Sequence, residues 1–258
     1  MALNAPVTIY GPTAEALTNA TKSADSQQVG QPPRLGGRGE QFVYNLWNGM
    51  QALATEGSYW TASTATPGTG IALSVAAGVA FADTQALLVI NNTATLGGPT
   101  IYLDFVKVIV TTAPATATSW SCAHRIDSAT RGTAGTQLGA TGTNARPSNM
   151  SYAGNSIGQV FALGASAVSV AASANVRNVG RNTLRGQIPV VLDDITIKYG
   201  SSENAAGGVG ISQATVGGIT VYAPVIAIGP QQSYVLNEWA AGRTGALSGE
   251  LMIGWVER

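Results

Sequence analysis

Few of the residues that could do chemistry in this chain stand in the pattern that a reaction needs. The segment 154–158, GNSIG, matches the G-x-S-x-G pattern of a serine nucleophile held on a tight turn. A hydrolase of that kind also needs a strand–turn–helix context and a histidine base that follows the serine in the chain. The only histidine is His124, which precedes Ser156, and the flanking residues have the pattern of strands. We therefore do not expect a serine hydrolase.

Two other residue pairs could bind a metal ion. Cys122 and His124 form a C-x-H pair, but a closed zinc site needs about four ligands, and the chain has no second cysteine or histidine. Alternation along a strand would place both side chains on one face, as a buried thiol beside a partly exposed imidazole. Asp193 and Asp194 could offer oxygens to calcium, but no calcium-binding loop surrounds them, and a turn between two strands explains them better. We expect no metal site.

No phosphate-binding motif is present either. The chain has no G-x-x-x-x-G-K-[ST] segment and no G-x-G-x-x-G segment between a strand and a helix. Thirteen acidic residues are scattered over 258 positions, so no pair stands out as the two carboxylates of a glycosidase. The sequence thus predicts no catalytic residue and no cofactor, and we expect a protein that is not an enzyme.

The chain has one electrostatic asymmetry, between residues 125 and 185, where Asp127 is the only acid that opposes six arginines. Arginine suits dehydrated, bidentate contacts such as those with carboxylates at protein interfaces. No aromatic platform for single-stranded nucleic acid accompanies these residues. We expect carboxylates of a neighbouring subunit to meet them, the alternative being solvated loop charge. The six are Arg125, Arg131, Arg146, Arg177, Arg181 and Arg185.

Charge is scarce in the chain as a whole. Only 10% of the residues are charged, against roughly 25% in an ordinary soluble domain. There is no charged side chain between Glu56 and Asp83, from 147 to 176, or from 204 to 237. Because a free monomer usually keeps itself soluble with surface charge, this composition indicates a subunit of a large assembly. The formal net charge of zero argues against a nucleic-acid partner.

The sequence offers no membrane anchor. A spanning helix needs about 20 strongly apolar residues, and the closest segment, 160–176, is interrupted by glycine, serine and asparagine. The N-terminus lacks the basic and apolar regions of a cleaved secretory signal. The single cysteine allows no disulfide within the chain. We expect no membrane partner, and stability from packing and association.

The first 56 residues differ from the rest and form the first predicted domain. Prolines and glycines in 27–39 predict an extended arm. A helix is predicted over about 40–55, because apolar residues recur there at helical spacing and Gly57 follows. This helix could pack on its own sheet or dock on a neighbouring subunit. The candidate interface residues of this region are Arg34, Arg38, Val43, Leu46 and Trp47.

Residues 57–258 form the second predicted domain, which has a β pattern. Short segments rich in Val, Ile, Thr and aromatic residues alternate with turn residues. They predict a mainly β fold, an antiparallel β-sandwich of the jelly-roll kind. A change of alternation between Phe105 and Val106 predicts a β-bulge, and 127–152 is expected to be a long surface loop. The predicted strands are 59–63, 71–76, 86–91, 101–111, 118–126, 159–163, 168–172, 188–192, 195–199, 220–228, 234–238 and 250–256.

The order and style of these segments resemble virion proteins of tailed bacteriophages, of the head-decoration or cement type. The resemblance is carried by 59–83 (YWTASTATPGTGIALSVAAGVAFAD), 101–110 (IYLDFVKVIV), 188–200 (IPVVLDDITIKYG), 225–239 (VIAIGPQQSYVLNEW) and 249–258 (GELMIGWVER). It implies a β-sandwich on the outside of an icosahedral shell, often trimeric, that clamps neighbouring shell subunits. It brings no catalytic residue with it, and it does not extend to the N-terminal arm.

The sequence and the resemblance together predict a structural virion protein that binds the capsid exterior and stabilises the shell. It would be made in the bacterial host cytoplasm. Its expected partners are the major capsid protein and copies of itself, as a homotrimer. A tail, head–tail connector or fibre component is the alternative, although 127–152 offers only Tyr152 as an exposed aromatic for host binding. A lytic or carbohydrate-active virion enzyme is a further alternative.

Overall fold

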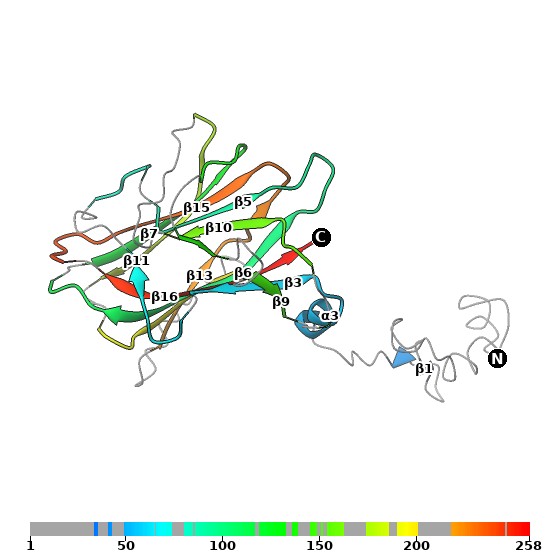
Figure 1. The fold of residues 1–258 in the computed structure, drawn as a ribbon, viewed down its shortest axis with the longest axis horizontal. Helices are drawn as coiled ribbons and strands as arrows, with labels where there is room; N and C mark the ends of the chain where they lie inside the picture. The colour runs from blue at the N-terminus through cyan, green and yellow to red at the C-terminus, as the bar shows by residue number, and fades with distance from the viewer. Residues whose placement is uncertain are drawn as a thin grey trace, which may run out of the picture. The chain divides into compact units, whose positions relative to one another are not determined.

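The computed structural model describes much of the β region and only short parts of what precedes it (Figure 1). For residues 34–35, 41–42, 49–50, 136, 145–146 and 184–185 only the backbone is described. Residues 53–258 form one compact unit, to which both large sheets belong, and residues 1–52 form another. The described residues are 34–35, 41–42, 49–64, 66–73, 80–84, 86–116, 119–132, 136–138, 145–148, 151, 154–162, 174–185, 190–200, 218–245 and 247–258.

Two large sheets make up the β region. The six-stranded sheet has the order β11 (Arg177–Arg185), β7 (Ser119–Asp127), β15 (Ser233–Trp239), β5 (Leu88–Asn92), β10 (Gly158–Ala162) and β8 (Thr136–Leu138). The eight-stranded sheet has the order β13 (Gly218–Ala223), β12 (Asp194–Tyr199), β6 (Ile101–Thr112), β16 (Ser248–Glu257), β3 (Tyr59–Ser63) and β9 (Ala145–Pro147), with β14 (Ala227–Ile228) on β6 and β4 (Ile71–Ala72) on β16. Among the described strands only β12 and β13 pair in parallel.

The two sheets face each other and enclose the main core (Figure 1). Leu88 and Tyr234 reach it from the six-stranded sheet, and Ile101, Leu251 and Trp255 reach it from the eight-stranded sheet; all five are fully buried. This confirms the prediction of a mainly β, antiparallel sandwich. None of the helices in the described part of the chain is long and apolar enough to cross a membrane.

Strand β6 contains the predicted bulge, one residue earlier than expected. Gly254 of β16 pairs with Phe105, and the next residue, Trp255, pairs with Leu103, which leaves Asp104 as the extra residue. The side chains on the two sides of the bulge then both return to the core face, as the sequence pattern indicated. The side chain of this extra residue has a partner in the fold: the Tyr59 hydroxyl donates a hydrogen bond of 2.7 Å to the Asp104 carboxylate.

The helix predicted over 40–55 is confirmed at its described C-terminal part and contradicted at its start. Helix α3 covers Gly49–Thr55, and Gln41–Phe42 forms the short strand β2, which pairs with β1 (Arg34–Leu35). The prediction was wrong at this end because Phe42, Val43 and Tyr44 are weak helix formers that favour strands. The C-terminal signal is confirmed: Gly57 has a φ of +74°, and its N–H donates to the Ala54 carbonyl.

Four predictions in the second half need correction or lie outside the described residues. The strand expected at 220–228 is two strands, β13 (Gly218–Ala223) and β14 (Ala227–Ile228), interrupted at 224–226 where Pro224 cannot donate a backbone hydrogen bond. The expected loop 127–152 contains β8 and β9, and β11 was not predicted at all. The strand expected at 188–192 is a turn over its described part, 190–192. The strand expected at 168–172 lies outside the described residues. β11 escaped prediction because its sequence, RNVGRNTLR, is polar and lacks alternation.

Candidate interaction site on the six-stranded sheet

Alternation along β7 places its arginine on the outer face of the six-stranded sheet. Trp120 and Cys122 point into the main core, whereas Arg125 lies beside residues of the outer face. A second apolar cluster lies on this outer face, made of Ala86, Val89, Phe161 and Val235. Outer-face side chains of a sheet are buried only if another segment covers them. Here two segments of the same chain do so, around Asp83 and around Arg131, and we call them the cover.

Four charged residues hold that cover in place, and we call them the arginine clamp: Asp83, Arg125, Asp127 and Arg131. The Asp83 carboxylate accepts hydrogen bonds from Arg125 and, at 3.1 Å, from Arg131. Arg131 also lies 3.4 Å from the Asp127 carboxylate, and both guanidinium groups are buried. Burial alone would raise the pKa of Asp83, but the hydrogen bonds from the two arginines hold it below its usual value.

Neutral hydrogen bonds tie the covering segments to the same strands. The Asn91 side chain of β5 donates to the Gly132 carbonyl at 2.8 Å. The Asn237 side chain of β15 donates to the Ala82 carbonyl at 3.0 Å. Gly132 packs so closely on Val89 that a Cβ at this position would lie 2.7 Å from a valine methyl group. The cover is therefore a fixed part of the fold.

Aromatic and arginine side chains continue from the clamp toward the open edge of the sheet. The Arg125 guanidinium lies 5.2 Å from the ring centre of Phe81, and Phe81 packs edge-on against Trp239 at 5.5 Å. Trp239 in turn lies 5.0 Å below the guanidinium of Arg181, which is exposed on β11. Arginine over an aromatic ring is a common element of protein interfaces. Arg181 is therefore the arginine best placed to meet a partner.

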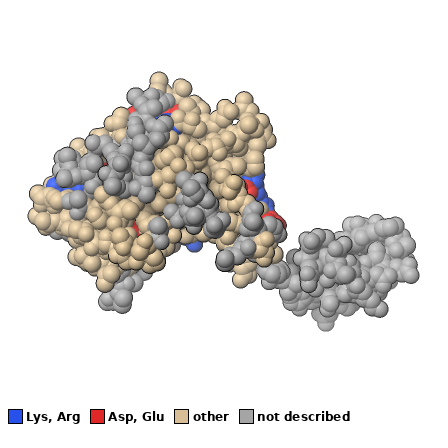
Figure 2. Space-filling model, viewed as in Figure 1, with Lys and Arg blue, Asp and Glu red and all other residues tan. Residues whose placement is uncertain are grey.

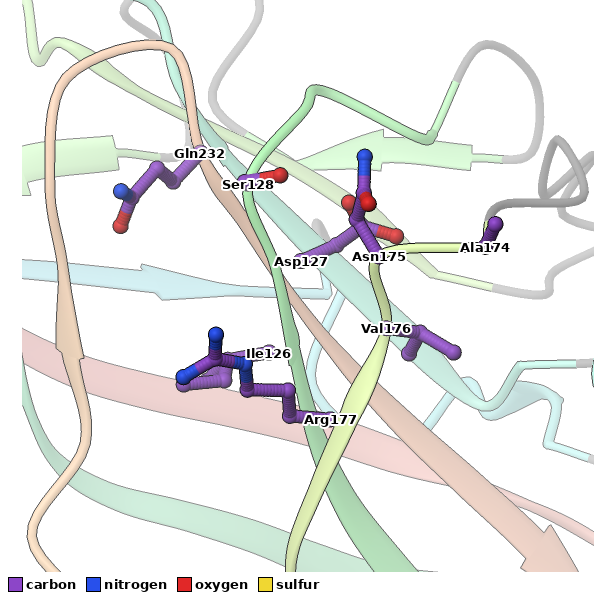
Figure 3. Close-up of a pocket in the computed structure, with 8 residues that line it drawn as sticks. All are labelled: Ile126, Asp127, Ser128, Ala174, Asn175, Val176, Arg177 and Gln232. Atoms are coloured by element: carbon purple, nitrogen blue, oxygen red, sulfur yellow. The ribbon is translucent and has the colours of Figure 1, made fainter.

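A polar pocket of about 510 Å³ lies beside the clamp (Figure 3). Its lining comes from three segments: the end of β7, the residues that lead into β11, and the turn before β15. Ser128, Asn175, Arg177 and Gln232 can offer hydrogen bonds there, while the Asp127 carboxylate is already engaged with Arg131. The lining contains no histidine or cysteine. The arrangement suits the binding of a polar group.

The arginines predicted as a group do not act as a group. The expectation that a neighbouring subunit supplies their carboxylate is wrong for Arg125 and Arg131, because both pair with Asp83 of the same chain. Arg177 and Arg181 are exposed. Sequence reasoning missed Asp83, Phe81 and Trp239, and no spacing signal connects them. Arg34 lies in β1, Arg146 in β9 and Arg185 in β11, with side chains that are not described; Arg38, Val43, Leu46 and Trp47 lie outside the described residues.

The single histidine belongs to a hydrogen-bonded chain inside the core. His124 Nε2 lies 2.7 Å from the Asn182 side-chain oxygen, and Nδ1 lies 2.7 Å from the Tyr234 hydroxyl, which in turn contacts Tyr199. The Asn182 amide donates to the Tyr222 carbonyl, so its side-chain oxygen accepts from Nε2–H of His124. His124 is fully buried, which corrects the expectation of a partly exposed ring.

Burial sets the protonation states along this chain. It lowers the pKa of His124, although the hydrogen bond to Asn182 opposes the change. It raises the pKa of the Cys122 thiol to about 12, so this buried cysteine is a poor nucleophile. It also raises the pKa of both tyrosines, Tyr199 and Tyr234. The cluster links β12 of one sheet to β7, β11 and β15 of the other.

The remaining motifs are also explained by local structure. The Ser156 hydroxyl donates to the Glu257 carboxylate, which also accepts from the Trp255 indole at 2.9 Å. Asp193 accepts from the backbone N–H of Val190 at 2.8 Å, as expected for a turn aspartate, and Asp194 pairs with Lys107. Across the described residues, no group of three His, Cys, Asp or Glu side chains is placed to hold a metal ion.

The described site thus combines an exposed arginine over a tryptophan with a polar pocket beside the buried arginine clamp. Comparison with protein-family models, with curated proteins and with solved structures gave no match.

Proposed function

We propose that this protein is a structural component of a bacteriophage virion that binds the outside of the capsid shell and stabilises it as a decoration or cement protein. It acts through protein–protein contacts with the major capsid protein and with copies of itself. Besides the sequence resemblance, three properties of the structure support this role.

The observation that carries the proposal is the uncharged surface. Figure 2 shows a broad face of the β region on which charged side chains appear only in small, scattered patches. Several of the charged side chains that do occur pair within the chain, as Arg125 does with Asp83, Arg243 with Glu238, and Lys107 with Asp194. Interface cores are depleted in charge, and a freely soluble monomer is usually rich in it. A surface of this kind suits permanent coverage by other subunits.

The strand order supports the same proposal. In chain order, eight of the strands are β3, β5, β6, β7, β11, β12, β15 and β16, and the chain changes sheet between them at every step except from β7 to β11, which pair with each other in the six-stranded sheet. Their spatial orders are β3–β16–β6–β12 and β5–β15–β7–β11. This is the arrangement that two Greek keys produce, so we infer that the sandwich is a jelly roll with β8, β9, β10 and β13 added. Jelly rolls are frequent in viral capsids, although the fold alone does not assign a function.

The groups that could support catalysis are engaged within the fold. His124 has hydrogen-bond partners on both ring nitrogens, Cys122 is buried, and Ser156 is bonded to Glu257. A nucleophile needs a base within hydrogen-bond reach and access to substrate. His124 instead connects β7 to β11 and β15, and Ser156 is bonded to Glu257 of β16, which agrees with a structural role.

Rebinding to particles tests the proposal. Purified full-length chain is added to phage particles that lack it, and bound protein is measured after sedimentation, together with the temperature at which the particles release their DNA. We expect saturable binding and a higher release temperature. Saturable binding without any change in release would contradict the stabilising role, and no binding to heads would contradict the proposal as a whole.

A further inference from the structure

The described arginine side chains differ in whether the chain itself supplies their counter-charge. In the described part of the chain, the side chains of Arg177 and Arg181 have no ion pair and no hydrogen bond. They lie on opposite faces of β11, because Arg177 is opposite Ile126, which packs against the main core, and Arg181 is opposite Ala123. Arg181 is thus the one cation of the described outer face without a counter-charge. The arginines that pair with a carboxylate of the same chain are Arg125, Arg131, Arg243 and Arg258.

Arg181 extends across the neighbouring strand. Strand β7 separates β11 from β15, yet the guanidinium of Arg181 lies over the ring of Trp239 on β15, at 5.0 Å from its centre. Between them on β7 lie Ala123, opposite Arg181, and Ser121, opposite Trp239. Both are small and face outward, since the alternate residues of β7 point into the main core, and both are buried all the same. A side chain that lies across them accounts for this burial.

The support under Arg181 is fixed as well. Phe81 packs edge-on against Trp239 at 5.5 Å between ring centres, and the guanidinium occupies a face of the same ring. Because this ring face is taken, Trp239 does not offer it to a base or a sugar as a stacking platform. An arginine on an aromatic face keeps its N–H donors available for a planar acceptor that binds in a bidentate manner. The group that completes this site is therefore an anion.

The charge around Arg181 favours a carboxylate as that anion. The nearest charged groups on the outer face are those of the arginine clamp, in which two carboxylates oppose two guanidinium groups. A ligand at Arg181 therefore meets one uncompensated positive charge. A nucleic-acid backbone is held by several cations at once, whereas a single carboxylate matches one guanidinium in charge and in geometry.

The described part of this chain has no carboxylate to spare. Each one forms an ion pair or accepts a hydrogen bond within the chain, so a second copy offers no described carboxylate that lacks a donor. The acceptor for Arg181 then comes from a different protein. The engaged carboxylates belong to Glu56, Asp83, Asp104, Asp127, Asp193, Asp194, Glu238, Glu250 and Glu257.

We propose that Arg181 binds an aspartate or glutamate side chain of the major shell protein, with Trp239 and Phe81 as its support. The identity of this partner rests on the proposed function. Because the aromatic rings already hold the guanidinium in place, binding does not have to order a free arginine side chain. The contact also gives shell binding a specific charged partner on an otherwise charge-poor protein.

Rebinding of Arg181→Gln to particles that lack the protein tests the proposal. Glutamine removes the charge and the bidentate donors, and we expect the dissociation constant to rise at least about tenfold. Lys198→Gln is the matched control, because Lys198 is exposed and has no ion pair among the described residues, but lies on the outer face of the eight-stranded sheet. We expect K198Q to bind as the wild type does. Melting temperatures close to that of the wild type show that both variants fold.

Arg181→Lys identifies the partner group directly. In particles reconstituted with R181K, a carbodiimide joins the new amine to an adjacent carboxylate as an amide, and the carbodiimide takes up the water that is released. Mass spectrometry of the cross-linked peptides should find an aspartate or glutamate of the shell protein joined to position 181. The wild type should give no cross-link there, because a guanidinium does not react in this way.

The outcomes separate this contact from the proposed function. If the wild type binds heads and R181Q binds equally tightly, the contact is overturned and the proposed function stands. Cross-links from position 181 only to copies of this chain, or to no carboxylate at all, would also overturn it. If the wild type does not bind heads, the proposed function fails and the contact with the shell protein fails with it.

Discussion

At the scale of single residues, the side chains with chemical potential serve as internal connections. His124 is the clearest case, because its two nitrogens bridge Tyr234 and Asn182 inside the core. Its neutral form fits this network, since Tyr234 can donate to Nδ1 while Nε2–H donates to Asn182. The arrangement makes stability depend on pH in a defined direction.

We expect His124 to destabilise the fold as the solution becomes more acidic. Its pKa in the folded protein lies below the usual 6.5, so the unfolded chain binds a proton that the folded chain does not. The free energy of unfolding should therefore fall as pH drops below about 6.5 and level off below the folded pKa, with about 1.4 kcal/mol lost per tenfold difference in proton affinity. Denaturant titrations across this pH range measure it.

His124→Gln provides the comparison, because glutamine does not titrate. Glu238 acts in the opposite direction, since burial raises its pKa to about 7 despite its contact with Arg243. That contribution is shared by both proteins and cancels in the difference. The difference in free energy of unfolding between wild type and H124Q should narrow toward low pH. A difference that is constant with pH would show that the pKa of His124 is the same in the folded and the unfolded chain.

The arginine clamp gives a second expectation at this scale. Asp83→Asn removes the charge shared by two buried guanidinium groups, and we expect the free energy of unfolding to fall by about 1–3 kcal/mol. This loss of stability is smaller than the loss expected for a wholly buried ion pair, because about a third of the Asp83 side chain is exposed. Glu56→Gln is the control, since the pair of Glu56 with Arg258 is more than half exposed. Equal effects of the two substitutions would contradict the clamp.

At the scale of elements, the long pairing of β6 with β16 organises the eight-stranded sheet. Gly249 lies at an irregularity of this pairing, and a Cβ there would approach the Ile109 carbonyl oxygen to 2.6 Å and a Leu73 methyl to 2.7 Å. The backbone oxygen cannot move away without disturbing the ladder. Alanine should therefore destabilise this strand pair.

We expect Gly249→Ala to lower the free energy of unfolding by about 1–3 kcal/mol, as overpacking of a close contact does. Gly154→Ala is the matched control, because a Cβ at 154 would make only ordinary contacts with Trp60, at 3.5 Å and beyond. Thermal unfolding of the two variants measures the difference. A G249A protein as stable as G154A would mean that β6 and β16 pair differently near Gly249.

The elements also show which features the sequence could predict. Alternation identified β3, β6 and β16, because a two-residue period is visible without the partner strand. It also indicated a bulge in β6, which it placed between Phe105 and Val106 rather than at Asp104. Strand β11 could not be predicted from the sequence, because its residues are polar and it forms a strand through its pairing with β7. The partner of Arg125 was missed for a similar reason. Asp83 lies 42 residues earlier in the chain, and only the packing of the cover on the sheet brings the two together.

At the scale of the whole molecule, the N-terminal region is expected to extend shell binding. A segment rich in glycine and proline can order on a neighbouring subunit when it binds. Deletion of residues 1–39 should therefore reduce incorporation into particles and leave the melting temperature of the β region nearly unchanged. Quantitative gel analysis of purified particles measures incorporation. Full incorporation of the truncated chain would remove the arm from the binding mechanism.

The central claim is that the molecule is a stoichiometric part of the phage head. The most direct measurement is its copy number in purified particles, relative to the major shell protein, by quantitative mass spectrometry. We expect a ratio close to that of the shell protein or a simple fraction of it. A trace ratio would contradict decoration of the shell and place the protein in the tail or connector, and its absence from particles would contradict a virion role altogether.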